Sequence, residues 1–283
     1  MDSNLPAKRA FLVLDCTPFD ERMTIVYLGL LIHSRVLPLA WRVMPAQQQW
    51  SERQWEIVKS LLDQVAPHLE HSDCTLLADR GLVGWPLVQL CRAQHWHYLL
   101  CVRREHTYRR WMGRWTAWRP LGQLLIKPGQ QWCGRVQLWR EQTLETHLSA
   151  VWGRAYQEVW LLISDRPVGR QRISEYAVRM RVEATFQDSK RRGWNLEASR
   201  ITDRSRLDRL LLALWWVTHL AAACLHHGHR QRFDRPDWRD KGIFRLGRLW
   251  LLDILRRARN AGALLRCLPF RRQGTTWRFA VRF

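Results

Sequence analysis

The sequence predicts an α/β protein in which a mixed sheet is flanked by helices and carries a β-rich insertion. Three observations lead to this class: short apolar runs that end in an acid, helical periodicity between those runs, and a tryptophan- and glycine-rich stretch near the middle. The chain has 283 residues, of which 47% are hydrophobic, so it can bury a sizeable core. Its length fits one large domain with an insertion, or two domains.

The first part of the chain alternates strands and helices. Apolar runs and helical periodicity predict, in order, strands at 11–14, 23–31 and 36–41, a helix from 51, a strand at 74–78, a helix at 83–94 and a strand at 98–102. Asp15 and Asp79 each follow an apolar strand, and Pro18 is expected to stop pairing after the first one. A carboxylate at the end of a buried strand is costly unless it is paired or metal-bound. Both acids are therefore candidate site residues, with a turn cap as the alternative for Asp15.

The middle of the chain has a different composition. Seven of the eighteen tryptophans lie between residues 111 and 160, interleaved with arginine and glycine, which predicts small strands and hairpins. These tryptophans could form the core of a small subdomain, or with the arginines a stacking surface for unpaired bases. We then expect a strand at 159–164, a helix from Ser174, an apolar helix at 207–225, an amphipathic helix at 249–258 and a basic tail or edge strand. The predicted division is 1–104, 105–157, 158–225 and 226–283.

The helix after Ser174 carries a polar stripe. Tyr176, Arg179, Glu183 and Lys190 fall within a sector of about 60° when each residue advances by 100°. An apolar stripe follows beside it, and Arg181 and Thr185 are expected on the side that faces water. An exposed ion pair between Arg179 and Glu183 is the simpler interpretation of part of this pattern. A carboxylate, a phenol and two cations beside a buried edge instead favour chemistry on an anionic substrate.

Charge narrows the choice of partner. The formal net charge is +21 and the sequence pI is near 11. This charge favours nucleic acid over a membrane surface, because no lipidation motif or amphipathic anchor accompanies it. The run 210–225 is too short and too polar for a membrane span. Seven cysteines without a C-x2-C pair indicate reduced thiols in a cytoplasmic protein, and no signal peptide is expected.

The spacing Y-x2-R-x3-E-x6-K from Tyr176 to Lys190 resembles the signature of the IS4 family of DDE transposases, the bacterial enzymes that move insertion sequences by cut and paste. Three further phrases, LVLDCT, VLPLAW and LLADRG, are similar to boxes around the first two acids of that family, and EASRI is similar to its continuation after the lysine. The resemblance implies a ribonuclease H-like fold. It also implies a catalytic triad of Asp15, Asp79 and Glu183.

What the resemblance implies for chemistry is specific. The three acids would hold two Mg2+ ions, with Mn2+ able to substitute, and would be poorly ordered or share a proton without metal. Tyr176, Arg179 and Lys190 would contact phosphates of double-stranded DNA. Trp152 and Trp160 are the candidates to replace a flipped base. A homodimer on transposon ends, associated with the nucleoid, is expected.

One feature departs from the resemblance, because the family places an end-recognising segment before its first acid and Asp15 lies close to the first residue. A fragment, a second polypeptide or a decayed element would each account for it. Two other functions stay open: a DNA-binding remnant or regulator without turnover, and a ribonuclease H-like nuclease that joins no ends. Asp20, Asp73 and Glu175 lie near the motif acids and are expected at the surface.

Overall fold

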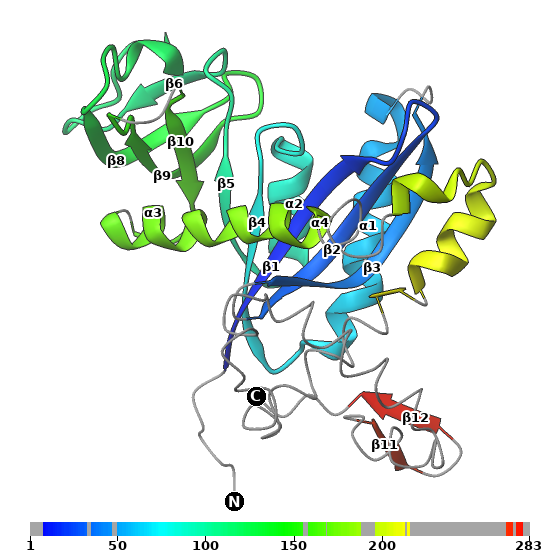
Figure 1. Cartoon of the computed structure of the whole chain (residues 1–283). Coiled ribbons are helices and arrows are strands. Elements are labelled where there is room, and N and C mark those ends of the chain that lie inside the picture. The colour runs from blue at the N-terminus through cyan, green and yellow to red at the C-terminus, as the bar shows by residue number, and fades with distance from the viewer. Residues whose placement is uncertain are drawn as a thin grey trace, which may run out of the picture. The chain divides into compact units, whose positions relative to one another are not determined.

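A mixed sheet of ten strands organises the first part of the chain (Figure 1). The computed structural model describes residues 8–32, 35–46, 50–154, 158–167, 169–187, 196–212, 214–215, 270–273 and 276–279. The chain divides into two units, 1–185 and 186–283. The sheet belongs to the first unit, and so do all the candidate site residues except Lys190, which lies outside the described residues.

The strands follow one another in a simple order at one edge of the sheet. They are β1 (Lys8–Pro18), β2 (Met23–Ile32), β3 (Arg35–Pro45), β4 (Ser72–Ala78) and β5 (His97–Cys101). Their spatial order is β3-β2-β1-β4-β5, with β1 to β3 antiparallel and β4 parallel to both β1 and β5. Parallel neighbours need a crossover connection, and α1 (Trp50–Val65) and α2 (Trp85–Ala93) lie in these connections.

Both faces of this sheet are covered. Leu14 belongs to a core cluster that also contains the apolar residues of α1 and α2. Val13 and Leu77 are just as buried but lie outside that cluster, on the opposite face, because side chains alternate along a strand. Asp15 shares the face of Val13 and contacts Arg179, so the segment that carries Arg179 covers this second face.

The predicted ribonuclease H-like mixed sheet flanked by helices is confirmed. The first strand differs in length, because β1 continues past Asp15 to Pro18 and pairs with β2 as far as Thr24. Pro18 does not end the strand early. It is the last residue of β1, where the loss of its N–H costs little.

The strands of the middle segment extend the same sheet. They are β6 (Thr107–Arg110), β7 (Arg119–Pro120), β8 (Gln131–Leu138) and β9 (Leu144–Val151), with a 3-10 turn η2 at Leu121–Gln123. The chain then returns through β10 (Trp160–Ser164), which pairs with both β5 and β9. The sheet therefore continues β5-β10-β9-β8-β6-β7 (Figure 1). The subdomain boundaries at 104/105 and 157/158 stay a prediction.

The signature helix is not one regular α-helix. It begins at Arg170 rather than near Ser174, and it consists of α3 (Arg170–Ala177), the 3-10 turn η3 (Val178–Met180) and α4 (Arg181–Gln187). A 3-10 turn advances each residue by about 120° instead of 100°, which rotates the residues after it by roughly 60°. Thr185 is for this reason buried, contrary to expectation, and its hydroxyl accepts a hydrogen bond of 3.0 Å from the N–H of Val36.

The second unit is described only in part. It contains the 3-10 turn η5 (Leu196–Ser199), a helical stretch at 204–212, and a two-stranded sheet of β11 (Phe270–Gln273) and β12 (Thr276–Phe279). Leu207, Leu211 and Trp215 are buried, in agreement with the predicted apolar helix, which begins a few residues earlier than expected. Most of that helix and the predicted helix at 249–258 lie outside the described residues. Among the described residues, no helix is long and apolar enough to cross a membrane.

Candidate active site

The two strand-end acids come together because of the parallel register of β1 and β4. The last register pair of this parallel ladder is Leu14 with Ala78. Asp15 and Asp79 are the next residue on each strand, where the parallel pairing ends. Two carboxylates thus leave neighbouring strands at the same level of the sheet, just after the last residue of β4 and three residues before the end of β1, in the region where α/β proteins commonly form their sites.

Arg179 of η3 joins these two acids. One guanidinium nitrogen, Nη2, lies 2.8 Å from Oδ2 of Asp15 and 3.1 Å from Oδ2 of Asp79. Arg179 and Asp15 are buried, whereas Asp79 is partly exposed. Because both acids reach the same nitrogen atom, their oxygens are close enough to share a cation. Burial alone would lower the pKa of Arg179, but the two carboxylates raise it, so the guanidinium stays charged.

Burial raises the pKa of Asp15 to about 6. Arg179 and the N–H of Cys16, which donates to Oδ1 of Asp15 at 2.8 Å, lower that pKa without cancelling the effect of burial. The charges of Asp79 and Glu183 raise it further. Asp15 is thus a carboxyl group that changes its charge close to neutral pH. The other two predicted acids, Asp79 and Glu183, both act on its pKa.

Asp79 begins a tight turn. Its Oδ1 accepts a hydrogen bond of 2.9 Å from the N–H of Gly81, while its Oδ2 contacts Arg179. A Cβ atom at position 81 would lie 3.2 Å from Oδ1 of Asp79, which is closer than most Cβ contacts. Glycine at 81 therefore lets the backbone approach the carboxylate and hold one oxygen, leaving the other oxygen for a cation.

Tyr176 lies beneath the turn at Asp79. It is buried, and its hydroxyl donates a hydrogen bond of 3.4 Å to the carbonyl of Ala78, while burial raises its pKa well above the usual range. The ring of Trp160 meets the ring of Tyr176 edge to face, with 5.4 Å between centroids. In this conformation Tyr176 and Arg179 both contact partners within the protein, so contact with a DNA phosphate would require these bonds to open.

The structure does not bring Glu183 into contact with the other two acids. Glu183 is exposed on α4, one turn beyond Arg179, and reaches Asp15 only through its electric field. Within the described ranges, no group of three or more histidine, cysteine, aspartate or glutamate side chains is close enough to hold a metal ion. The expected disorder or proton sharing of the acids without metal stays a prediction; in this structure the Arg179 guanidinium offsets the repulsion between Asp15 and Asp79.

The two tryptophans predicted to stack on a base differ in their surroundings. Trp152 is half-buried and packs against the main hydrophobic core, and its backbone pairs with Gly129 and Gln130. Trp160 lies at the start of β10, and its ring contacts Tyr176. Tyr176 in turn bonds to the carbonyl of Ala78, the residue before Asp79. Of the two, Trp160 is the one joined to the predicted site.

Sequence reasoning missed one neighbour of Asp15. Tyr27 of β2 is the register partner of Asp15 and is fully buried on the same face of the sheet. Burial, and secondly the charge of Asp15, raise the pKa of Tyr27 well above its ordinary value. A tyrosine inside the otherwise aliphatic run of β2 was the available signal, because an antiparallel neighbour places its side chain beside the acid.

The three other acids considered near the motif serve the fold. Oδ1 of Asp20 accepts hydrogen bonds of 2.8 Å from the N–H groups of Arg22 and Met23 and so closes the turn before β2. Asp73 pairs with Arg166, and the carboxylate of Glu175 pairs with Arg172 at 2.5 Å. None of the three is fully exposed, as the expected surface position would require: all are half-buried, and Glu175 is the most buried. Arginines compensate the charges of Asp73 and Glu175.

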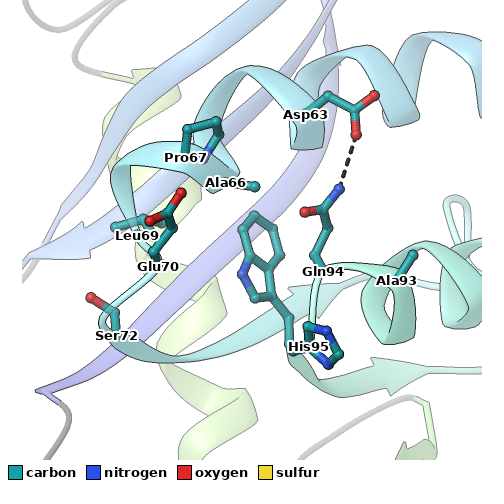
Figure 2. Close-up of a pocket in the computed structure, with 10 residues that line it drawn as sticks. Asp63, Ala66, Pro67, Leu69, Glu70, Ser72, Ala93, Gln94 and His95 are labelled. Carbon is teal, nitrogen blue, oxygen red and sulfur yellow. Dashed lines mark hydrogen bonds between the residues drawn. The ribbon is translucent and has the colours of Figure 1, made fainter.

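A pocket lies at the opposite end of β4 from these acids (Figure 2). It is formed where α1 ends and β4 begins, and where α2 ends before β5, with Gln94 donating a hydrogen bond of 2.9 Å to Asp63 (Figure 2). Ser72 lines it, whereas Asp79 follows the last residue of the same strand. Seven strand residues separate the two by roughly 20 Å. The pocket is therefore not part of the acid site.

The chain belongs to a known family of DNA-modifying enzymes. A family model described as Transposase DDE domain matches residues 30–220, more than half of the chain. Asp79, Arg179 and Glu183 lie within the matched residues, and Asp15 precedes them. No match to a curated protein was found. The family identifies the protein as a DDE transposase-type enzyme that acts on DNA, in agreement with the two acids just beyond the last parallel pair of β1 and β4.

Proposed function

We propose that this chain is the catalytic core of a cut-and-paste transposase of the IS4 type, which cleaves DNA strands and joins them to a target. The observation that carries this proposal is the pair of carboxylates one residue beyond the last parallel register pair of β1 and β4, bridged by one cationic nitrogen. In the proposal Asp15, Asp79 and Glu183 are the catalytic acids. The net charge of +21 supports a polyanionic substrate.

The residues present fit a hard divalent cation. Carboxylate oxygens are the ligands that Mg2+ and Mn2+ prefer. Two of them already converge on a positive group, and the Nε of Arg179 is buried without a hydrogen-bond partner among the described residues. We expect Asp15 and Asp79 to hold the ions with Glu183 as a further ligand once α4 approaches. Two bound ions would activate the attacking oxygen and stabilise the departing one.

The protein groups then have separate tasks. Asp15 must lose its proton before it can bind a cation, and its raised pKa makes this the pH-sensitive step. Arg179, released from the two acids if they held a cation instead, would be available for a phosphate oxygen beside the scissile bond, together with Tyr176 and Lys190. In cleavage a water oxygen would bond to phosphorus and give a 5′ phosphate, while the bond from phosphorus to the 3′ oxygen breaks and that oxygen takes up a proton to leave as a 3′ hydroxyl. In joining, a 3′ hydroxyl would take the place of the water.

Other parts of the proposal concern the assembly. Transposon ends bind as double-stranded DNA, a homodimer forms on the DNA, and the protein acts in the cytoplasm at the nucleoid. Trp160 is our candidate to stack on a base displaced near the cut; its ring contact with Tyr176, which bonds to the carbonyl of Ala78 just before Asp79, supports this choice. Trp152 is the weaker candidate, since its ring packs on the core.

The test is nicking of supercoiled plasmid by the full chain with Mg2+ or Mn2+, and transfer of a cut end to a second DNA. Glu183→Gln should lower the nicking rate by about a thousandfold or more while DNA affinity persists, because it removes a metal-binding charge without removing volume. Glu56→Gln is the matched control. It changes another exposed helical glutamate, which lies on α1 and pairs with Arg53 at 3.4 Å, and should nick like the wild type.

The possible results separate the three candidate functions. Undiminished nicking by Glu183→Gln would contradict the assigned role of Glu183. Metal-dependent nicking without any joining of ends would indicate a nuclease. Salt-sensitive DNA binding with no nicking at any metal concentration would indicate a DNA-binding remnant or regulator.

A further inference from the structure

A hairpin at the edge of the sheet carries an unusual concentration of arginine and tryptophan. We call it the Arg–Trp hairpin and define it as residues 107–120, from β6 to β7 at the end of the strand order (Figure 1). Trp111 and Trp115 form an isolated antiparallel bridge, and the N–H of Met112 donates to the carbonyl of Arg114 at 3.0 Å. Gly113 makes the tip with a φ of 75°, so the turn needs a glycine or a similarly tolerant residue.

The tryptophans of this hairpin do not serve the core. Trp132, Trp139 and Trp152 of the neighbouring strands and loops pack against the main hydrophobic cluster, whereas Trp111 and Trp115 do not belong to it. Trp111 is 45% exposed and Met112 beside it is 69% exposed. A group of exposed large apolar side chains marks an interaction surface more often than a structural element.

Arginine side chains lie over the indole rings of the hairpin. The guanidinium of Arg109 lies 5.6 Å from the ring centroid of Trp115 and 5.0 Å from that of Trp118. The guanidinium of Arg135, which also pairs with Glu145, lies 5.7 Å from the ring of Trp111. Such exposed cation–π contacts contribute about 0.5–1 kcal/mol each. They order the rings together with the edge-to-face contact of Trp111 and Trp115 at 5.1 Å, and Trp111 keeps 45% of its surface exposed.

The local charge selects the partner. Between residues 103 and 119 the sequence has six arginines and one acid, Glu105. A second copy of this chain would place the same arginines against one another, so the hairpin does not fit itself. Exposed indoles set among cations instead match a strand whose bases are accessible and whose backbone is anionic. Base stacking on an aromatic side chain is worth about 1–3 kcal/mol, more than the cation–π contacts already present.

We propose that the Arg–Trp hairpin binds unpaired nucleotides of DNA, with Trp111 as the base-stacking residue and Arg114 at the tip as a phosphate contact. The inference rests on the proposed function in taking DNA as the partner, but it assigns a surface outside the acid site. Strand cleavage and strand joining expose unpaired stretches, and this surface would hold one of them away from Asp15 and Asp79.

The test measures the affinity of the full chain for a fluorescein-labelled oligothymidylate of about 20 nucleotides by anisotropy, in salt between about 50 and 200 mM. Trp111→Ala should weaken binding by about fivefold or more without changing the slope against salt. Arg114→Gln should reduce that slope by about 0.7, the value of one phosphate contact to a single strand. Trp111→Phe should recover most of the lost affinity, because it keeps an aromatic face.

Ile126→Ala is the matched control, since Ile126 is 74% exposed in the same segment but lies outside the hairpin, and it should bind like the wild type. Equal affinities of Trp111→Ala and Ile126→Ala for the oligonucleotide would overturn the inference. Displacement of the oligonucleotide by polyglutamate as readily as by unlabelled DNA would also overturn it, because it would indicate an acidic protein as the partner. Plasmid nicking by the same preparations separates the two proposals. If the wild type nicks plasmid but Trp111→Ala binds the oligonucleotide as tightly as the wild type, the proposed function stands and the hairpin inference fails. If Trp111→Ala weakens oligonucleotide binding but the wild type nicks no plasmid, only the hairpin inference stands.

Discussion

Replacement of Arg179 by methionine should destabilise the metal-free protein strongly at pH 8 and weakly at pH 5. The change keeps a long side chain but removes the cation that lies 2.8 Å from Oδ2 of buried Asp15. Removing one partner of a buried ion pair costs about 3–5 kcal/mol. The contact with Asp79 adds little, because that carboxylate is partly exposed to water. We therefore expect a loss of about 3 kcal/mol at pH 8.

The pH dependence follows from the raised pKa of Asp15. At pH 5 this carboxyl, with a pKa of about 6, is mostly protonated and needs no counter-ion, so Arg179 contributes little. Thermal unfolding at the two pH values measures the effect. A loss of 3 kcal/mol corresponds to a fall in Tm of about 6–12 °C for a unit of this size. Asp15→Asn added to Arg179→Met should restore about 2 kcal/mol, because the charge without a partner is gone.

Metal provides an independent measurement. Mg2+ should raise the Tm of Arg179→Met by more than that of the wild type, because no guanidinium competes for the space between the carboxylates. Arg53→Met is the control. Arg53 is an exposed arginine on α1 paired with Glu56 at 3.4 Å, and its loss should change Tm little. An equal loss of stability at both pH values, together with no rescue by Asp15→Asn, would refute the assignment of Arg179 as the counter-ion of the acids.

Three further predictions concern the same site. Metal-dependent nicking should rise with pH through a midpoint near 6, since Asp15 must be deprotonated to bind a cation; a profile that is flat from pH 5 to 8 would contradict this. The stability of the metal-free protein should depend on pH in the opposite direction. Between pH 3.8 and about 6, Asp15 keeps its proton in the folded protein but releases it in the unfolded chain. The contribution of Asp15 to the unfolding free energy therefore falls as pH rises. Tyr176→Phe should lower the unfolding free energy by about 0.5–1 kcal/mol in urea, because its 3.4 Å hydrogen bond to Ala78 is lost while the ring contact with Trp160 remains; an unchanged midpoint would show that the hydroxyl is not bonded.

The placement of the two strand-end acids was within reach of the sequence. An apolar run followed by an acid marks a strand end, and two such runs joined through a helix predict parallel neighbours. Asp15 and Asp79 consequently meet at one level of the sheet. The partner of Arg179 was not predictable, since angles around a helix place a side chain in a sector but do not identify what faces that sector. The same stripe fits an arginine that meets a phosphate and one that meets two carboxylates.

Two errors have a local physical cause. The burial of Thr185 was missed because the 3-10 turn at 178–180 shifts the phase of α4, and a single 3-10 turn leaves no clear mark on the residue pattern. The separation of core tryptophans from surface tryptophans was also out of reach. Trp111 and Trp132 occur in similar stretches rich in arginine and glycine, and only the pairing of β6 with β8 decides which face each one takes.

The two strands that flank the middle segment, β5 and β10, are hydrogen-bonded to each other. The chain thus leaves β5 and returns in β10 at adjacent positions, and the strands between them in sequence extend the sheet beyond β10. The length and content of the middle segment can change in evolution without parting the strands that hold Asp15 and Asp79, and a shortened version would still close the ladder. Selection can therefore act on the geometry of Asp15 and Asp79 separately from the DNA-binding preference of the middle segment, within one polypeptide.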